Sequence, residues 1–229
     1  MIYDYTDKLY KRYALFIVRA FNSLNRDLQG LAFDELNTAK AYKTVNEKVK
    51  KVYKKVYDEL IEMLILIVLH SFEESCDKIL DKKGSVITYY TGKKDGFRKE
   101  HTFDAALFVA LFLDESDYVT KYVFNNEYER KIARTVEALL TSTNKADINK
   151  ELKKALRYWN IQAKQAGDDL TMDGYIEGFM AAGVKKVRWV TQEDPKVCAD
   201  CEERDGKIYD IDKIKIPLHY NCRCYFVPV

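Results

Sequence analysis

Residues 34–82 contain neither glycine nor proline, so this part of the chain lacks the residues that most readily end a helix. Apolar side chains recur within it every three or four positions, which is the spacing of one helix face. They are Tyr42, Val45, Val49, Val52, Val56, Leu60, Met63 and Ile67. The pattern predicts one very long helix, or two in line. It also predicts that this apolar seam, residues 42–67, packs on a neighbouring helix or on a second copy of the chain.

The opposite face of the same segment is basic. It carries Lys40, Lys43, Lys48, Lys50, Lys51, Lys54 and Lys55, with Glu47 among them. One interpretation is a solvated helix face, and the other is a surface for nucleic-acid phosphates formed by Lys48, Lys50, Lys51, Lys54 and Lys55. The whole chain has 38 basic and 36 acidic residues and a net charge of +2, which excludes a polycation held on nucleic acid by bulk charge.

Most of the remaining chain also has helical patterning. Helices are expected at 4–28, 105–113, 115–141 and 147–166, with a stop at 167–169 and a further helix to about 182. The segment 105–113 is apolar almost all round and is expected to be buried. Glycines at 84, 92 and 96 bracket the β-branched and aromatic run 86–91, which predicts a short hairpin. Nine glycines and three prolines in 229 residues argue against an all-β sandwich.

The helical pattern of the sequence ends at Gly183. Short strands are expected at 187–191 and 223–227, and four of the five cysteines lie in the last 32 residues. The fold class predicted is therefore mainly α. An elongated helical body of long helices spans residues 1–183, and a small α+β module rich in Cys and His spans residues 184–229.

The cysteines of this module have the spacing of metal ligands. Cys198-x-x-Cys201 is followed by His219-x-x-Cys222 and by Cys224, which offers five ligands for four positions around a tetrahedral ion. Zinc suits this mixture of sulfur and imidazole, and four protein ligands would make the site structural. Because neighbouring strand residues point to opposite faces, the set expected is Cys198, Cys201, His219 and Cys222, with Cys224 as the substitute. The alternatives are disulfides and small buried side chains without any bond.

The sequence carries no membrane-spanning or catalytic pattern. The most apolar run, 63–69, is far shorter than the roughly 20 residues of a spanning helix. The start of the chain has no secretory pattern, so we expect cytoplasmic synthesis, reduced thiols and no membrane partner. No His-Glu-x-x-His, Walker or Gly-x-Gly-x-x-Gly motif occurs, and no His-x-Glu precedes Cys198 as in zinc deaminases. We therefore expect no catalytic residues and no enzyme.

The tail resembles the phage head morphogenesis domain, a Mu F-like minor head protein family. The resemblance is carried by 187–191 (Val-Arg-Trp-Val-Thr), Asp194, Cys198-x-x-Cys201, Gly206 and the ending Pro217-x-His219-x-x-Cys222-Arg223-Cys224. The family's usual ending is Pro-x-His-Pro-x-Cys-Arg-Cys, and here Tyr220 replaces the second proline. Residues 132–135 (Ile-Ala-Arg-Thr) resemble the opening of that domain, although Val136 intervenes before Glu137. The likeness covers about residues 131–229, and 104–183 would be the helical start of the family domain.

What the resemblance implies is a minor capsid protein of a phage or prophage. Such a protein is made in the host cytoplasm and is located in the virion, inside the capsid near the portal or the packaged DNA. Its partners would be the portal protein, the major capsid protein, or both, with non-specific contacts to DNA.

The alternative is a zinc-knuckle regulator that binds nucleic acid. A DNA-reading module is usually strongly basic, but residues 184–229 carry nine basic and eight acidic side chains. The minor capsid interpretation is therefore preferred.

Overall fold

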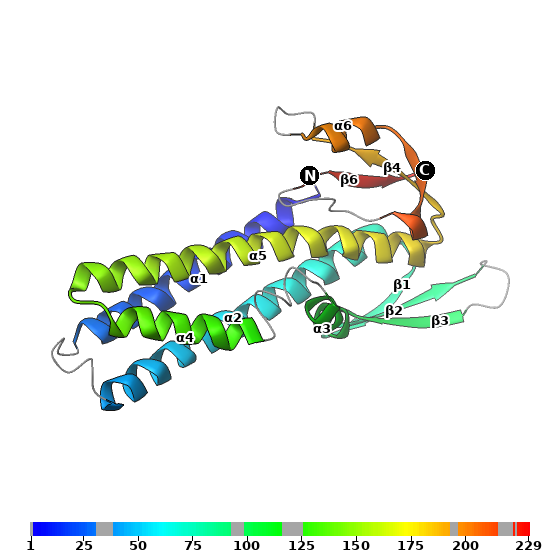
Figure 1. The fold of residues 1–229 in the computed structure, drawn as a ribbon. Coiled ribbons are helices and arrows are strands. Elements are labelled where there is room, and N and C mark those ends of the chain that lie inside the picture. The colour runs from blue at the N-terminus through cyan, green and yellow to red at the C-terminus, as the bar shows by residue number, and fades with distance from the viewer. Residues whose placement is uncertain are drawn as a thin grey trace. The chain divides into compact units, whose positions relative to one another are not determined.

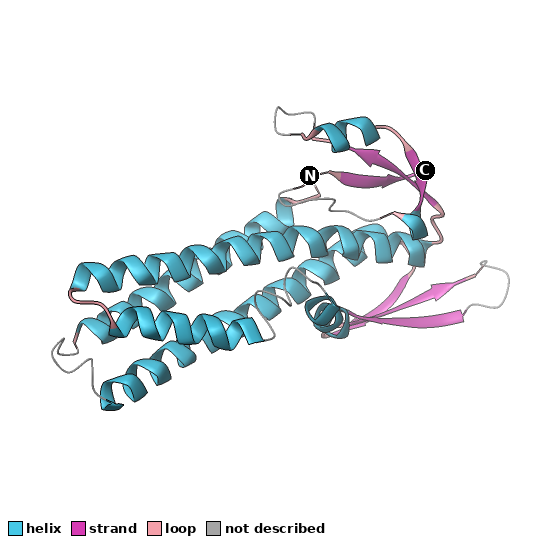
Figure 2. Ribbon diagram, viewed as in Figure 1, coloured by secondary structure: helices cyan, strands magenta, loops and turns pink. Residues whose placement is uncertain are grey.

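The computed structural model describes residues 2–30, 39–92, 99–115, 126–192, 197–214, 222 and 224–229. Helices dominate (Figures 1 and 2). The α-helices are α1 (Asp4–Gln29), α2 (Ala39–Ser75), α3 (Ala105–Glu115), α4 (Asn126–Leu140), α5 (Lys145–Ala182) and α6 (Ala199–Arg204). The strands are β1 (Ile79–Lys83), β2 (Val86–Thr91), β3 (Lys99–Asp104), β4 (Lys186–Val190), β5 (Ile208–Asp210) and β6 (Tyr225–Pro228), and a 3-10 turn η3 covers Ile211–Lys213.

The chain forms two compact units. Unit 1 consists of Met1–Leu9, Met63–Ala110 and Gln165–Val229, and unit 2 consists of Tyr10–Glu62 and Leu111–Lys164. The helices α1, α2 and α5 each contribute residues to both units. Both sheets and the cysteine-rich tail belong to unit 1.

Unit 2 is a bundle of helical segments from α1, α2, α4 and α5. The centre of its core is Tyr53, which is 1% exposed and whose ring meets Phe21 and Trp159 edge to face. The Tyr53 hydroxyl shares a hydrogen bond with Thr135 Oγ1 at 2.7 Å, so its polar end is satisfied inside the bundle. Tyr10 of α1 donates to Asn160 of α5, and Asn25 donates to Asn149, which joins the same two helices a second time.

In unit 1, α5 packs closely on the second half of α2. Its three glycines, Gly167, Gly174 and Gly178, face α2, because a Cβ added at any of them would meet an α2 side chain or backbone atom within 3.3 Å. A helix stop predicted at 167–169 is therefore wrong. Gly167 provides space for Ile67 and Thr6 within an unbroken 38-residue helix, and residues 168–182 continue that helix.

Two small antiparallel sheets pack on different helices of unit 1. The first has the order β1-β2-β3, so the predicted hairpin is part of a three-stranded sheet. Phe72 of α2 stacks on Phe103 of β3 with ring centroids 4.4 Å apart, which fixes this sheet on α2. The second sheet has the order β5-β4-β6 and shares a core with Tyr175 and Phe179 of α5. The strands predicted at 187–191 and 223–227 correspond to β4 and β6.

Several other expectations are corrected by the structure. The long helix after residue 34 ends at Ser75, and β1 begins four residues later. Along its seam, Tyr42 is 52% exposed, and Tyr53 is fully buried in a position between two expected members. The helix α3 is not buried all round, since Leu107 and Leu111 are 58% and 48% exposed.

The structure thus confirms a mainly helical fold with small antiparallel sheets. The helical segment expected at 4–28 is α1, and the break expected at Gly183 is the end of α5. Gly183 has φ +88°, and Val184 N donates to Phe179 O at 2.9 Å, which is a common helix ending. The division into domains at residues 183 and 184 stays a prediction.

Glu177 of α5 gives this fold a testable pH dependence. Burial raises the pKa of its carboxyl above the ordinary value of 4.5, so the folded protein favours the protonated form. Stability from this group is present below pH 4.5 and is lost as the pH rises through the raised pKa. Glu177→Gln is therefore expected to raise the melting temperature at pH 7 and to leave it unchanged at pH 4.

Thermal unfolding of the parent and the variant at both pH values checks this expectation. Glu137→Gln, at an exposed glutamate of α4, serves as the control and is expected to change nothing. A Glu177→Gln protein less stable than the parent at pH 7 would contradict the burial argument.

Candidate metal centre

The strand β4 anchors the cysteine-rich part of unit 1. Its side chains alternate, so Val187 and Trp189 are fully buried while Lys186 and Arg188 are exposed. This is the pattern of a strand with one face on a core. Trp189 pairs across the sheet with Phe226 of β6, and their rings meet edge to face with centroids 5.5 Å apart.

The short helix α6 is held beside β4 by backbone hydrogen bonds. Gly206 N donates to Trp189 O, and Trp189 N donates to Lys207 O, both at 2.9 Å. Gly206 has φ +72°, a conformation that glycine adopts without strain. Cys198 is the N-cap of α6, and its carbonyl accepts hydrogen bonds from Cys201 N and Glu202 N. The Cys-x-x-Cys segment therefore forms a tight turn against the strand.

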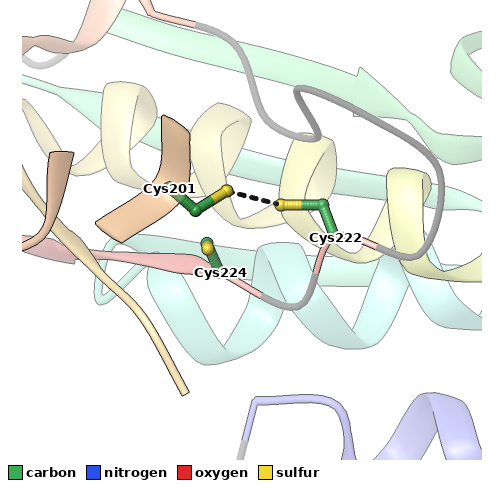
Figure 3. A group of neighbouring side chains, drawn as sticks. All are labelled: Cys201, Cys222 and Cys224. Atoms are coloured by element: carbon green, nitrogen blue, oxygen red, sulfur yellow. Dashed lines mark hydrogen bonds between the residues drawn. The ribbon is translucent and has the colours of Figure 1, made fainter. Parts of the chain in front are cut away.

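Three of the five predicted ligands lie together. The sulfur atoms of Cys201, Cys222 and Cys224 are all within 4.8 Å of one another, and all three residues are buried. In Figure 3 the side chain of Cys201 extends from α6 toward the other two, which come from the segment before β6. The Sγ atoms of Cys201 and Cys222 are 3.7 Å apart. None of the five cysteines forms a disulfide bond in the structure.

The placement of Cys224 corrects the expectation based on strand geometry. We expected Cys222 and Cys224 to point to opposite faces of one strand. The strand β6 begins only at Tyr225, so the alternation rule does not apply to the two cysteines. Both thiols instead reach the same point, and Cys224 is a full member of the cluster.

The two other predicted ligands have different outcomes. Cys198 is half-buried, packs against the core around the cluster, and lies within hydrogen-bonding reach of the Cys201 thiol. His219 lies outside the described residues.

The thiols of the cluster are strongly shifted toward their protonated forms. Burial raises the pKa of Cys201 to about 12. The hydrogen bond with the Cys222 thiol, together with burial, raises the pKa of Cys224 well above its ordinary value. In the metal-free protein both thiols are therefore neutral at pH 7. An ion that binds them must displace their protons, so its affinity falls as the pH falls.

The N-terminus of the chain closes one side of the cluster, which the sequence did not indicate. Tyr3 OH donates to the carbonyl of Cys224 at 2.9 Å, and Ile2 packs against the same core. Burial raises the pKa of Tyr3 well above its ordinary value, and the charges of Asp168 and Cys222 raise it further. No local motif marks Tyr3, because its role depends on a contact across 221 positions of sequence.

The structure also places the predicted nucleic-acid face. Lys48 pairs with Asp27 at 3.7 Å, Lys50 pairs with Glu129 at 3.4 Å, and Lys54 pairs with Asp58 at 3.0 Å. Acidic side chains from α1, α4 and α2 itself thus offset three of the five lysines. Lys51 and Lys55 are exposed. Phosphate binding by this face stays a prediction, with less free positive charge than the sequence indicates.

Most of the apolar seam of α2 is buried within the chain. Val45, Val49, Val56, Leu60, Met63 and Ile67 are each at most 5% exposed. Self-association through residues 42–67 stays a prediction, with little of the seam exposed to support it. Among the described helices, none combines the length and the apolar character needed to cross a membrane.

Comparison of this chain with protein-family models, with curated proteins and with solved structures finds no match.

Proposed function

We propose that this chain is a minor capsid protein of a phage or prophage, with a role in head morphogenesis. It would act inside the capsid near the portal or the packaged DNA, with the portal protein, the major capsid protein, or both as partners. The role is structural and needs no catalytic residue. The single observation that carries the proposal is the ordered set of residues in the tail, from the strand 187–191 to Cys224.

The proposal is supported by the positions of those residues in the structure, where several of them pack together. Trp189 of the strand motif, Cys201 of the first cysteine pair and Cys222 and Cys224 of the ending share one buried core. Gly206 occupies a turn with positive φ, which explains a glycine at that point of the pattern. Residues that carry the resemblance along the tail thus contribute to one buried core.

We further propose that the core is stabilised by a structural zinc ion. Four thiolates placed about 2.3 Å from zinc at the corners of a tetrahedron lie about 3.8 Å from one another. The 3.7 Å between the Sγ atoms of Cys201 and Cys222 fits this geometry. Thiolate ligands favour zinc over the hard ions magnesium and calcium, and bound zinc would hold the ligand segments in α6 and before β6 together.

The capsid role is tested by co-expressing the chain with the portal and major capsid proteins of the same phage or prophage. Retention in purified particles through a high-salt wash is the expected result. A double variant, Cys201→Ser with Cys224→Ser, is expected to lose retention, because it disrupts the core that presents the docking surface. Cys76→Ser, at a buried cysteine outside the cluster, is the matched control and is expected to be retained.

Soluble protein that is absent from particles would overturn the capsid proposal. Binding of that free protein to DNA would then favour the zinc-knuckle regulator.

A further inference from the structure

We infer that the metal is held by four thiolates, those of Cys198, Cys201, Cys222 and Cys224. The ion would belong to the zinc class, since soft sulfur ligands in a tetrahedral set select it. This inference rests on the structural metal site proposed above and is independent of the capsid role.

Three positions of the tetrahedron follow directly from the geometry. Cys201, Cys222 and Cys224 converge from two segments of chain, one in α6 and one before β6 (Figure 3). Each of the three residues is at most 3% exposed. Three thiolates alone would leave the ion with an open position, which water occupies in catalytic zinc sites.

The surroundings favour a protein group at the fourth position. The core that encloses the cluster is apolar, with Met172, Trp189 and Phe226 each fully buried. A metal-bound water in such a core would lack the polar partners that buried water needs. A fourth ligand from the chain avoids that cost and closes the site.

We assign the fourth position to Cys198, whose sulfur lies outside the group of three sulfurs within 4.8 Å of one another and would have to move toward them when the ion binds. It lies one turn before Cys201, whose backbone N–H donates to its carbonyl at 3.1 Å, and the two thiols are within hydrogen-bonding reach. The Cys198 side chain makes no capping hydrogen bond to the start of α6, although it occupies the N-cap position. The Cys198 side chain packs against the cluster core and is half-buried.

The test uses purified full-length protein in which cobalt(II) replaces zinc. Cobalt absorbs visible light with bands whose position depends on whether its ligands are four sulfurs or three sulfurs and a nitrogen. The parent is expected to bind one cobalt per chain with the four-sulfur spectrum. His219→Gln is expected to keep both the stoichiometry and the spectrum. Cys198→Ser is expected to bind cobalt at least tenfold more weakly.

A second variant keeps the inference testable if Cys198→Ser does not fold. Cys198→His restores a ligand at the same position and is expected to bind cobalt with the spectrum of three sulfurs and one nitrogen. The inference is overturned if the parent itself shows that mixed spectrum, or if His219→Gln alters the spectrum or the stoichiometry. Because no capsid component is present, the result is separate from the particle experiment.

Discussion

Removal of the metal is expected to lower the melting temperature of unit 1 by about 10 °C. An ion present at a thousandfold excess over its dissociation constant stabilises the state that binds it by about 4 kcal/mol. For a chain of this size, each kcal/mol corresponds to about 2–4 °C. The loss is expected around the cysteine cluster, because the ligand segments before β6 and in α6 would no longer be held together. The helices of unit 2 hold no ligand from the proposed set, and their melting is expected to change little.

The two tryptophans of the chain allow the units to be followed separately. Trp189 lies in the core of the cluster, and Trp159 lies in the core of unit 2. In a Trp159→Phe protein, fluorescence reports on the cluster alone, and in a Trp189→Phe protein it reports on unit 2. Dialysis against a chelator under reducing conditions is expected to shift the Trp189 transition much further than the Trp159 transition. An unchanged Trp189 transition in protein shown to be free of metal would contradict a stabilising ion.

The helices could be predicted from the sequence because their evidence is local. The absence of glycine and proline and the spacing of Val45, Val49 and Val56 both act over a few turns of one helix. The end of α5 could also be predicted, because a glycine commonly follows the last turn of a helix. In the structure Gly183 has the positive φ of such an ending. The spacing did not show exactly which residues of the helix are buried. Tyr53 is buried because Phe21, Thr135 and Trp159 surround it, and these come from three other helices.

Gly167 shows why the same residue type was misinterpreted. A glycine followed by two aspartates has the composition of a helix end and a new N-cap. In the folded protein Gly167 instead lies against Ile67 and Thr6, where a larger side chain has little room. Asp168 and Asp169 are then buried within the helix, and Asp169 accepts a hydrogen bond from Gln165. Tertiary packing decided the conformation, and it cannot be read from the neighbouring residues.

The candidate metal site was also only partly predictable from the sequence. Residue type and spacing identified the cysteines, because structural zinc sites are mostly built from Cys and His at close spacing whatever the fold. Which of them converge depended on where a strand begins. Cys222 and Cys224 precede β6, which starts at Tyr225, so their side chains do not alternate between the two faces of a strand as the sequence-based prediction assumed. The contact from Tyr3 could not be predicted at all, because it joins the two ends of the chain.

Replacement of Gly178 by alanine is expected to destabilise the protein by about 2 kcal/mol. A Cβ at this position would lie 2.7 Å from the backbone oxygen of Phe72 and would overlap Ser75 Oγ, which donates a hydrogen bond to Ser71 O. The helices α2 and α5 would have to separate, and overpacking of this kind costs about 1–3 kcal/mol or more. The higher helix propensity of alanine offsets about 1 kcal/mol of this loss of stability. The packing cost is expected to dominate because a backbone atom cannot rotate away.

The matched controls are the two other glycines on the same face of α5. Alanine gains the same helix preference at each position, so differences among the three variants isolate the packing between α2 and α5. At Gly174 the nearest atoms are Ser71 Cβ at 2.9 Å and Val68 O at 3.1 Å, and an intermediate loss is expected. At Gly167 the nearest atom is Ile67 Cδ1 at 3.3 Å, the end of a side chain that can turn aside. Gly167→Ala is therefore expected to stay within about 1 kcal/mol of the parent. Chemical denaturation of the three variants measures the order directly. A Gly178→Ala protein as stable as Gly167→Ala would show that α2 and α5 are not packed as closely as the glycines require.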